Sequence, residues 1–468
     1  MNQVAANPDR KGCGWRSRTL RHSPDLSALQ AHLPQRYPCL LESVAHGTPQ
    51  ARYDILFAFP QASIELDGDG HCTVGGEVSE DSFLESLDRQ WRQTHTVVDH
   101  PAELPFSGGW VLYLGYELVA EIEPRLSLPK GSNPFPVACA LRVPAAIIWD
   151  HQRKQTHVIA ETDQAHLLNE MESDITDVQG VKSKEIQLGL AAWEEDEPQR
   201  FLDGVGRIKA YIEAGDVFQV NLSRAWRTTL SDGITAAEVY GHLRRTNPAP
   251  FAGLFHLNDE QAIISSSPER LVSIRHGQVS TRPIAGTYPR GVNATDDRYL
   301  AEQLVAHPKE RAEHVMLIDL ERNDLGRVCE PGSIQVDEFM VVEHYRHVHH
   351  IVSQVSGRLR EGWTPIEVIR ATFPGGTITG CPKVRCMEII SELEQIQRGA
   401  YTGAMGYLNR DGSMDLNILI RTLVKEGKEL SLRAGAGIVA DSVAERELAE
   451  TRAKAEGLLR IFDRIRAH

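Results

Sequence analysis

The feature that most constrains the fold is the pattern of short apolar runs that end at turn residues. In the first half of the chain these runs are rich in aromatic and β-branched residues, which is typical of strands. They cover residues 53–59, 109–116 and 137–149. In the second half, Asp411-Gly412 separates two apolar runs, 405–408 and 416–424, and predicts a hairpin. Helices alternate with strands only in irregular blocks, so the pattern indicates an α+β fold and not a doubly wound βαβ sheet.

Helices are expected where apolar residues recur at spacings of three and four. One begins at Phe201 and ends at Gly215, a second runs from Pro308 to about Arg322, and a third covers 445–465. Between the first two, residues 262–267 and 271–274 are predicted to form strands.

A glycine-rich loop, residues 374–381, runs directly into a further helix whose first residue is expected to be Pro382. Free N–H groups of such a loop, together with the positive end of the helix dipole, suit an anionic ligand. The loop therefore predicts part of an anion site.

A polar, charged stretch at 181–199 divides the 468 residues into two regions and is the best candidate for a linker. We expect an N-terminal region over 15–180 and a second region over 200–465. No run of 18 apolar residues is present, and Met1 to Arg18 contains no apolar signal segment. The seven cysteines have no metal-type spacing, so we expect a cytoplasmic protein with reduced thiols and no membrane contact.

The net charge is -14, because 64 acidic residues outnumber 50 lysines and arginines. This charge argues against nucleic acid as a partner, and it cannot attract an anionic substrate from a distance. An anion site must therefore be built locally from Arg, Lys, backbone N–H groups or a bound cation.

Acidic residues pair at helical spacing on two predicted helices. Glu310 and Glu313 lie on one, and Glu447, Glu450 and Lys454 share a face of the other. Two such pairs could meet around one Mg²⁺, which prefers carboxylates, water and ligand oxygens. On spacing alone, solvated faces of surface helices are the favoured explanation, and Glu450 with Lys454 is an ordinary helix-stabilising pair.

Eight segments in order resemble the chorismate-utilising enzymes and cover residues 200–460 densely. They are Gln219-Val-Asn-Leu, Ser267-Pro-Glu-Arg, Arg282-Pro-Ile-Ala-Gly-Thr, the Glu310 helix, His347-Val-His-His-Ile-Val-Ser, the Gly375 loop, Ala434-Gly-Ala-Gly-Ile-Val-Ala-Asp-Ser, and Glu450-Thr. The resemblance implies the fold of anthranilate synthase component I, in which two antiparallel sheets pack as a sandwich with helices around them. It also implies Mg²⁺ bound directly by Glu313 and Glu450, with Glu310 and Glu447 close by.

The N-terminal region resembles the family more thinly. Leu40-Leu-Glu-Ser is similar to the motif that holds tryptophan in related proteins, which makes Leu41, Glu42 and Ser43 candidate tryptophan contacts. Whether tryptophan binds this chain, or inhibits it, is left open by the sequence.

The family resemblance also assigns roles to residues around chorismate, a dianion with a poor leaving group. It implies that the N–H groups of Gly286 and Thr287 hold the ring carboxylate and that Arg421 pairs with the enolpyruvyl carboxylate. Positions that assist in the family correspond to Tyr401, Gly437, His350 and Lys454.

Glu269 is implied to be the general acid that protonates the departing hydroxyl, which requires a carboxyl kept neutral near pH 7. Pairing with Arg270 is the alternative. His347, His349 and His350 resemble a metal cluster, but alternate faces of a strand cannot easily bring all three together.

The nucleophile is implied by Gln219. Family members that use water carry a Lys base at this position, and a neutral amide cannot take a proton from water, so ammonia is expected. The chain contains no Gly-x-Cys-x-Gly elbow in a suitable context. The resemblance therefore implies that a separate glutamine amidotransferase subunit supplies the ammonia.

Two amination sites remain open. Asn221, Ile378-Thr379 and Asp415-Leu-Asn-Ile-Leu-Ile-Arg resemble aminodeoxychorismate synthases, which replace the C4 hydroxyl on the route to 4-aminobenzoate and folate. Ala285 instead resembles anthranilate synthases, which aminate C2 and eliminate pyruvate, because many aminodeoxychorismate synthases carry a nucleophilic Lys there. We favour C4. A non-catalytic scaffold or tryptophan-sensing subunit is a third possibility, opposed by the complete set of charged site residues.

Overall fold

The computed structural model describes residues 4–5, 14–44, 52–96, 104–129, 131, 135–178, 192–344 and 348–462, and the side chains of residues 4, 5, 287 and 348 lie outside this description. No described helix is long and apolar enough to cross a membrane.

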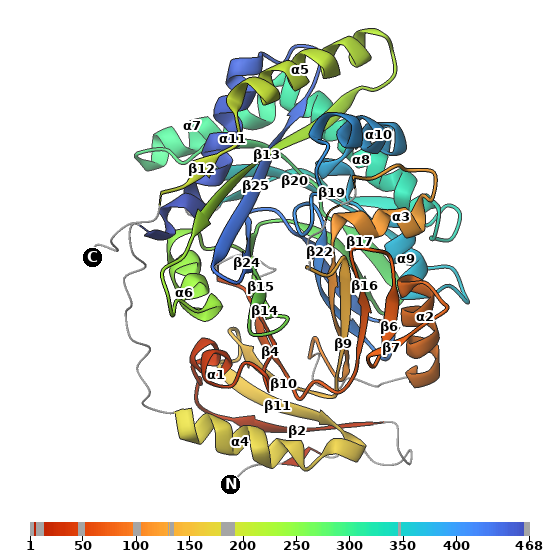
Figure 1. Ribbon diagram of the computed structural model, residues 1–468, viewed down its shortest axis with the longest axis vertical. Helices are drawn as coiled ribbons and strands as arrows, with labels where there is room; N and C mark the ends of the chain where they lie inside the picture. Colours follow the sequence, from red (N-terminus) through yellow and green to blue (C-terminus); the bar gives the residue numbers. More distant parts are fainter. Residues whose placement is uncertain are drawn as a thin grey trace.

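Two large antiparallel sheets form the centre of the molecule (Figure 1). The 13-stranded sheet has the order β1-β2-β11-β10-β4-β3-β14-β15-β24-β25-β13-β12, with β21 also on β13. Its strands are β1 (Val4–Ala5), β2 (Trp15–Leu20), β3 (Cys39–Glu42), β4 (Tyr53–Ala58), β10 (Ala145–Asp150), β11 (Gln155–Glu161), β12 (Glu194–Glu195), β13 (Gln219–Thr229), β14 (Phe251–His256), β15 (Gln261–Ser267), β21 (Gly380–Cys381), β24 (Thr422–Glu426) and β25 (Glu429–Ile438).

The 12-stranded sheet has the order β18-β20-β17-β16-β23-β22-β8-β9-β5-β6-β7, with β19 also on β20. Its strands are β5 (Ser63–Leu66), β6 (Cys72–Val74), β7 (Glu77–Val78), β8 (Gly109–Leu114), β9 (Ala138–Val143), β16 (Arg270–Arg275), β17 (Gln278–Thr281), β18 (Ile284–Pro289), β19 (Gln335–His344), β20 (Val348–Arg358), β22 (Ala404–Asn409) and β23 (Met414–Ile418).

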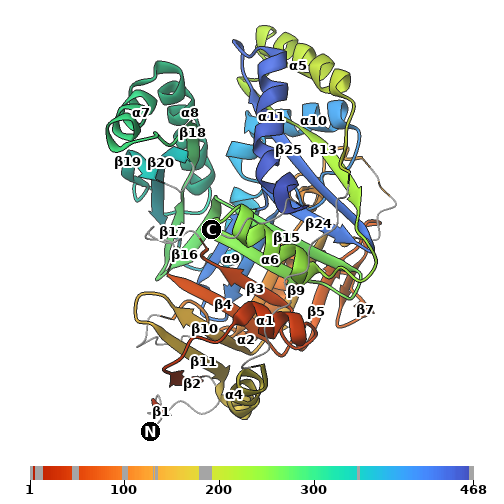
Figure 2. The same ribbon diagram turned by 90° about the vertical axis from the view of Figure 1, so that its left-hand side faces the viewer.

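Helices cover the outer faces of both sheets (Figures 1 and 2). They are α1 (Leu26–His32), α2 (Phe83–Thr94), α3 (Val119–Ile122), α4 (Leu167–Val178), α5 (Pro198–Glu213), α6 (Ala236–Thr246), α7 (Ala294–Ala306), α8 (Pro308–Gly326), α9 (Pro365–Thr372), α10 (Lys383–Glu394) and α11 (Ala444–Leu459). Single 3₁₀ turns are η1 (Tyr116–Leu118), η2 (Thr162–Gln164), η3 (Gly376–Ile378) and η4 (Arg460–Phe462).

Apolar burial explains this layering. Phe57 and Phe255 of the first sheet and Tyr113 and Tyr407 of the second belong to one core cluster, which fills the space between the sheets. A second cluster joins the outer face of the 12-stranded sheet to α2, α8 and α9, and a third joins the outer face of the 13-stranded sheet to α1, α4 and α6. The expected sandwich of two antiparallel sheets with surrounding helices is confirmed.

Two apolar runs that were expected to be continuous strands are each divided between the two sheets. Residues 137–149 form β9 and β10, which break at Pro144, and residues 416–424 are interrupted after β23, before β24 begins. The prediction of single strands was wrong because both halves of each run are buried, so the apolar pattern continues across the break. A third passage between the sheets lies at Pro268 and Glu269, between β15 and β16.

Strands from both sides of the expected linker pair directly. β3 pairs with β14, and β8 pairs with β22, so each sheet contains both regions of the chain. Residues 181–191 lie outside the described residues. The described end of the stretch already carries β12 and the first turn of α5, which begins at Pro198, three residues before the expected start.

The ends of other helices differ slightly from expectation. α8 includes Gly326, and the last helix begins at Ala444 and gives way to η4 at Arg460. Pro382 is the N-cap of α10 and not its first helical residue, since its ψ of 137° is extended.

Candidate active site

The passages between the sheets position two charged side chains of the candidate site. Glu269 lies in the passage from β15 to β16, and Arg421 lies in the passage from β23 to β24, where its φ is 51°. The two passages are hydrogen-bonded to each other, because the N–H of Ile418 donates to Glu269 O at 3.0 Å and the N–H of Ser266 donates to Arg421 O at 3.1 Å. The ends of these strands therefore place Glu269 and Arg421 next to each other at one corner of the sandwich.

A cavity of about 560 Å³ opens at this corner and is lined by residues of α8, β18, β20, α11, β13 and β25. Figure 2 shows α8, β18 and β20 on one side and α11, β13 and β25 on the other. It collects most side chains that the sequence singled out. These are Gln219, Glu269, Gly286, Glu310, Glu313, His350, Tyr401, Arg421, Gly437, Glu447, Glu450 and Lys454. Thr287 pairs with His350 in β18–β20, but its side chain lies outside the described residues.

Four acids from two helices face this cavity, Glu310 and Glu313 from α8 and Glu447 and Glu450 from α11. Burial raises the pKa of Glu313, and the nearby charges of Glu310 and Glu450 raise it further. Burial and Glu450 likewise raise the pKa of Glu447. The like charges are thus close enough to repel one another. The two acid pairs therefore line one cavity, although Glu450 itself stays exposed.

Carboxylate oxygens that repel one another are a donor set that suits a hard cation such as Mg²⁺. Among described residues, only Asp67, Asp69 and His71 bring three potential ligand atoms within 4.8 Å of one another, and they lie in the β5–β6 turn. The four glutamates are therefore more widely spaced, which leaves room for water or substrate oxygens between them. Lys454 already forms the ordinary helical pair with Glu450 at 2.7 Å and donates to Gly435 O at 3.1 Å.

Glu269 is a buried carboxyl, 5% exposed, whose Oε1 accepts no hydrogen bond from any described residue. Burial raises the pKa of Glu269 to about 7, although Lys454 and Arg421 oppose the shift. The alternative pairing with Arg270 is wrong, because Arg270 binds Asp415 through two hydrogen bonds of 2.8 and 3.0 Å. Glu269 is thus able to hold a proton near neutral pH and to donate it into the cavity.

Gln219 lies at the start of β13, 3% exposed, and its Nε2 donates to Glu313 Oε1 at 3.4 Å. Its Oε1 is buried and accepts no hydrogen bond from the described part of the chain. The close approach of β25 explains Gly437, because a Cβ there would lie 2.3 Å from Gln219 Nε2. The amide therefore presents an unused acceptor in the cavity wall.

Gly286 is the extra residue of a bulge in β18 and has a φ of 66°, which glycine adopts without strain. A Cβ there would lie 2.8 Å from Glu310 Oε2, so the backbone reaches the acid cluster. His350 Nδ1 lies 3.4 Å from Gly286 O, and burial lowers the pKa of His350 to about 4. This histidine is neutral at pH 7.

The neighbouring histidines do not join His350. His349 Nε2 contacts Asp297 at 2.9 Å and its Nδ1 contacts His344 Nδ1 at 2.7 Å, so His349 and His350 have separate partners on β20. His347 lies outside the described residues.

The glycine-rich loop contributes less than expected. Thr377 and Ile378 line the cavity, but the N–H groups of Ile378 and Thr379 donate back to Gly375 O and Gly376 O. No residue of the first turn of α10 lines the cavity, and Lys383 there pairs with Asp324. The loop therefore reaches the cavity through Thr377 and Ile378, whereas the N-terminus of α10 does not.

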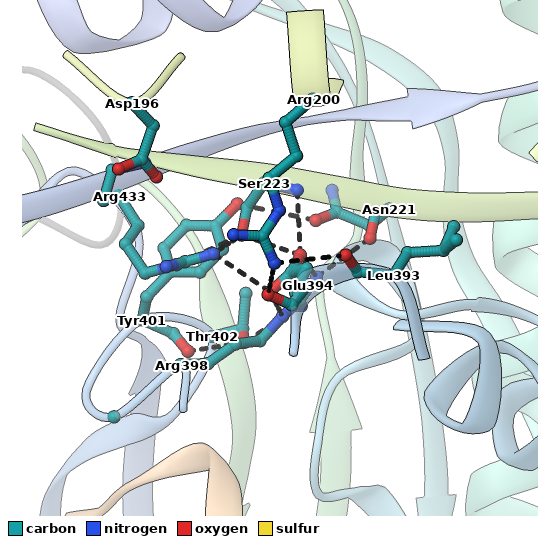
Figure 3. Close-up of polar contacts among 12 residues, drawn as sticks. Asp196, Arg200, Asn221, Ser223, Leu393, Glu394, Arg398, Tyr401, Thr402 and Arg433 are labelled. Carbon is teal, nitrogen blue, oxygen red and sulfur yellow. Dashed lines mark hydrogen bonds and ion pairs between the residues drawn. The ribbon is translucent and has the colours of Figure 1, made fainter. Parts of the chain in front are cut away.

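A buried ion cluster supports the cavity wall from behind. Figure 3 shows the Glu394 carboxylate at its centre, held by Arg398, Arg433 and Ser223 at 2.7–3.0 Å. Arg398 also donates to Asn221 O at 2.9 Å, and its guanidinium lies 5.5 Å from the centre of the Tyr401 ring. The cluster therefore holds Asn221 and Tyr401, two residues of the cavity wall, in place.

Three polar residues of the cavity wall were given no role by the sequence interpretation. Thr377 lies within the glycine-rich loop, Lys309 directly precedes Glu310, and Arg433 directly precedes the Ala434 motif. Their place next to recognised motifs was the available signal. Lys309 also pairs with Asp441 at 3.2 Å, which joins α8 to the segment before α11.

Leu41, Glu42 and Ser43 line a different cavity of about 470 Å³, between β3 and β14 of one sheet and β16, β22 and β23 of the other. Glu42 accepts hydrogen bonds from Tyr240 at 2.5 Å and Arg244 at 2.7 Å, and burial raises its pKa to about 7. Tryptophan binding in this cavity stays a prediction.

The profile of the chorismate binding enzymes matches residues 39–460. The chain belongs to this family and is a chorismate-utilising enzyme. It is 39% identical over 446 residues to aminodeoxychorismate synthase component 1 of Bacillus subtilis, covering 92% of both chains. It is also 39% identical over 438 residues to anthranilate synthase component 1 of Thermus thermophilus, again covering 92% of both.

The solved structure of anthranilate synthase component I from Streptococcus pneumoniae aligns with a TM-score of 0.79 at 32% identity, over 97% of this chain and all of that chain. This likeness agrees with the two-sheet architecture. The two relatives described above carry different names, and each is 39% identical to this chain.

Proposed function

We propose that this chain is the chorismate-aminating component of an aminodeoxychorismate synthase. In this reaction ammonia replaces the C4 hydroxyl of chorismate, and 4-amino-4-deoxychorismate, a precursor of 4-aminobenzoate, is formed. The observation that carries the use of ammonia is the neutral Gln219 amide in the cavity, with its unused Oε1 acceptor, and Asn221 in the same cavity wall supports the choice of C4 by its resemblance to aminodeoxychorismate synthases. An amide oxygen can orient ammonia through an N–H hydrogen bond, whereas it cannot deprotonate water.

The other cavity residues would bind the substrate carboxylates, bind the metal ion and donate a proton. Arg421 and the backbone of Gly286 would hold the two carboxylates of chorismate, for which the planar guanidinium is well suited. Glu313 and Glu450, with Glu310 and Glu447 nearby, would hold Mg²⁺, and this ion would supply charge neutralisation for the ring carboxylate. Glu269 would donate its proton to the leaving hydroxyl as the C–O bond breaks.

A second candidate function, anthranilate synthesis, is favoured by one observation. Ala285 lines the cavity and is 6% exposed, so no nucleophilic side chain stands at this position of β18. Amination at C4 would then proceed by direct attack of ammonia. The same Ala285 suits attack of ammonia at C2 followed by loss of pyruvate.

The product of one reaction distinguishes these candidates. Purified protein is incubated with chorismate, Mg²⁺ and ammonium at alkaline pH, and the products are separated with and without an added 4-amino-4-deoxychorismate lyase. We expect a non-aromatic amino product that the lyase converts to 4-aminobenzoate. Fluorescent anthranilate would instead establish the second candidate, and no turnover would contradict both.

Ammonia supply is tested separately. Some relatives are named as components of larger synthases, and we propose that a separate glutamine amidotransferase subunit feeds this chain. The single chain should use ammonium but not glutamine. Glutamine-dependent turnover by the purified chain alone would refute this part of the proposal.

A further inference from the structure

One side chain of the cavity wall has a polar atom that the chemistry described so far does not use. Among the described residues, three that line this cavity each carry a buried side-chain atom without a hydrogen bond: Oε1 of Gln219, Oε1 of Glu269 and the Thr377 hydroxyl. The proposed function uses the first two. Buried polar groups are almost always hydrogen-bonded, so the Thr377 hydroxyl needs a partner from the cavity.

The backbone places Thr377 next to the segment that carries Glu269. A Cβ on Gly375 would lie 2.9 Å from Ile418 Cδ1 and 3.3 Å from Leu271 Cδ1, so the loop packs closely against these two side chains. Both lie beside Glu269, because Leu271 follows it by two residues and the N–H of Ile418 donates to Glu269 O at 3.0 Å. Thr377 and Glu269 therefore reach the same cavity from adjoining segments.

The Thr377 hydroxyl has no part in holding its own loop. The hydroxyl of Thr379 donates to Gly375 O at 3.0 Å, and the N–H of Asn221 donates to Thr379 O at 2.9 Å. These bonds fix the loop against β13. The position of Thr377 is therefore set before a ligand binds, and its hydroxyl stays available for that ligand.

Chorismate has one polar group that the proposed function leaves without an acceptor. Its two carboxylates are assigned to Arg421, the Gly286 backbone and Mg²⁺, and its ether oxygen has no hydrogen to donate. The C4 hydroxyl does have one. A protonated Glu269 that donates to the C4 oxygen cannot also accept from the same hydroxyl with good geometry. Since Gln219 Oε1 is assigned to ammonia, the Thr377 hydroxyl is the acceptor that remains.

We propose that Thr377 is a substrate-binding residue whose hydroxyl oxygen accepts a hydrogen bond from the C4 hydroxyl of chorismate. The inference rests on the proposed function, because it assumes that chorismate occupies this cavity. The contact holds the leaving oxygen where Glu269 can protonate it. As the C–O bond breaks, this oxygen carries two hydrogens and becomes more positive, so its hydrogen bond to Thr377 strengthens. Thr377 therefore contributes to kcat as well as to binding.

The test compares three threonine-to-valine variants, which remove a hydroxyl and keep the shape of the side chain. Thr377 is unpartnered and lines the cavity. Thr281 is also unpartnered and is 1% exposed, but it does not line the cavity. The Thr372 hydroxyl, equally buried, donates to Val368 O at 2.9 Å. Calorimetry with chorismate and Mg²⁺ but no ammonium measures the dissociation constant, and urea titration measures the unfolding midpoint.

We expect Thr377→Val to raise the dissociation constant for chorismate about fivefold, the effect of one lost neutral hydrogen bond. Its kcat with ammonium should fall about tenfold, because the bond is stronger in the transition state. Its urea midpoint should not fall, since the free protein loses no hydrogen bond. Thr281→Val should keep the wild-type dissociation constant and midpoint, and Thr372→Val should lower only the midpoint.

A second variant shows whether the hydroxyl itself is responsible. Thr377→Ser keeps the hydroxyl and should bind chorismate within about twofold of the wild-type value. Equal losses in Thr377→Ser and Thr377→Val would assign the effect to the methyl group and overturn the inference. An unchanged dissociation constant in Thr377→Val would overturn it as well. If Thr377→Val does not fold, Thr377→Ala takes its place under the same criteria.

The 4-deoxy analogue of chorismate, which lacks only the C4 hydroxyl, identifies the group that Thr377 binds. The wild-type protein and Thr377→Val should bind this analogue equally, and a persisting fivefold difference would contradict a contact with the C4 hydroxyl. Binding also separates the inference from the proposed function. A wild-type protein that binds chorismate but makes no amino product contradicts only the proposed function. An aminating enzyme in which Thr377→Val binds chorismate normally contradicts only the inference.

Discussion

At the scale of single residues, most site positions predicted from motifs lie in one cavity. Gln219, Glu269, Arg421 and Glu450 come from distant parts of the chain, yet all line it. These residues could be identified because each motif is recognisable from a few consecutive residues. Arg433 was given no role because its place in the cavity wall depends on the pairing of β13 with β25, which no local pattern reports.

The first prediction concerns the general acid. Glu269→Gln keeps the shape of the side chain but removes its proton, so kcat should fall by about 10²–10⁴-fold. The dissociation constant for chorismate, measured by calorimetry, should change by less than about threefold. Arg270→Lys, which alters the neighbouring Asp415 pair and the contact with the Phe251 ring, is the matched control. An active Glu269→Gln variant would remove Glu269 from this role.

A second prediction concerns Glu321 of α8, which is 6% exposed and whose pKa burial raises to about 8. The folded protein keeps this proton up to about pH 8, whereas an unfolded Glu loses it near its ordinary value of 4.5. The free energy of unfolding therefore falls as pH rises from about 4.5 to 8, because in this range the folded state binds the Glu321 proton and the unfolded state does not.

Glu321→Gln removes this dependence. Its free energy of unfolding relative to wild type should increase between pH 4 and pH 9 by more than about 1.4 kcal/mol, the value of one pKa unit. Urea titrations at the two pH values measure the difference. An equal offset at both would show that Glu321 ionises normally.

At the scale of elements, the helices and strands that apolar periodicity predicted are present, and their bounds differ by only a few residues. The exceptions are residues 137–149 and 416–424, where the chain passes from one sheet to the other. Period-two and continuous apolar patterns report burial but not which sheet buries a residue. The second passage places Arg421 in the cavity, so the missed break was part of the site.

The third prediction concerns the Glu394 cluster that joins α10 to β13 and β25. Glu394→Gln leaves Arg398 and Arg433 buried without their carboxylate, since the Glu394 side chain is 2% exposed. We expect a loss of about 3–5 kcal/mol in the free energy of unfolding. Glu392→Gln on the same helix, whose side chain is 39% exposed, should cost less than about 1 kcal/mol. Equal losses would contradict the importance of the cluster.

At the scale of the whole molecule, the pairing of the two regions could not be predicted from the sequence. Residues 15–180 and 200–465 have different compositions, which suggested separate units, but β3–β14 and β8–β22 bind them together. Strand partners separated by more than 200 residues leave no local signal. The cavity, by contrast, lies between α8 and α11, which are both in the second region.

The fourth prediction concerns these two helices. Because their glutamates repel one another, Mg²⁺ with chorismate should draw α8 and α11 together, and EDTA should reverse the effect. Hydrogen exchange of the Glu269→Gln variant, which binds without turnover, measures it. Protection should appear in 308–326 and 444–459 and be lost on Glu313→Gln. Protection confined to other segments would contradict a cation between these helices.

The pairing of early with late strands has a consequence during synthesis. β3 and β8 each bind one neighbour that is made soon afterwards, β4 and β9, while their second neighbours, β14 and β22, are made much later. One edge of β3 and one edge of β8 therefore stay unpaired until the chain has been synthesised up to residues 256 and 409, respectively. Such edges invite pairing with other chains. This protein should consequently depend on chaperones during translation far more than its folded stability suggests.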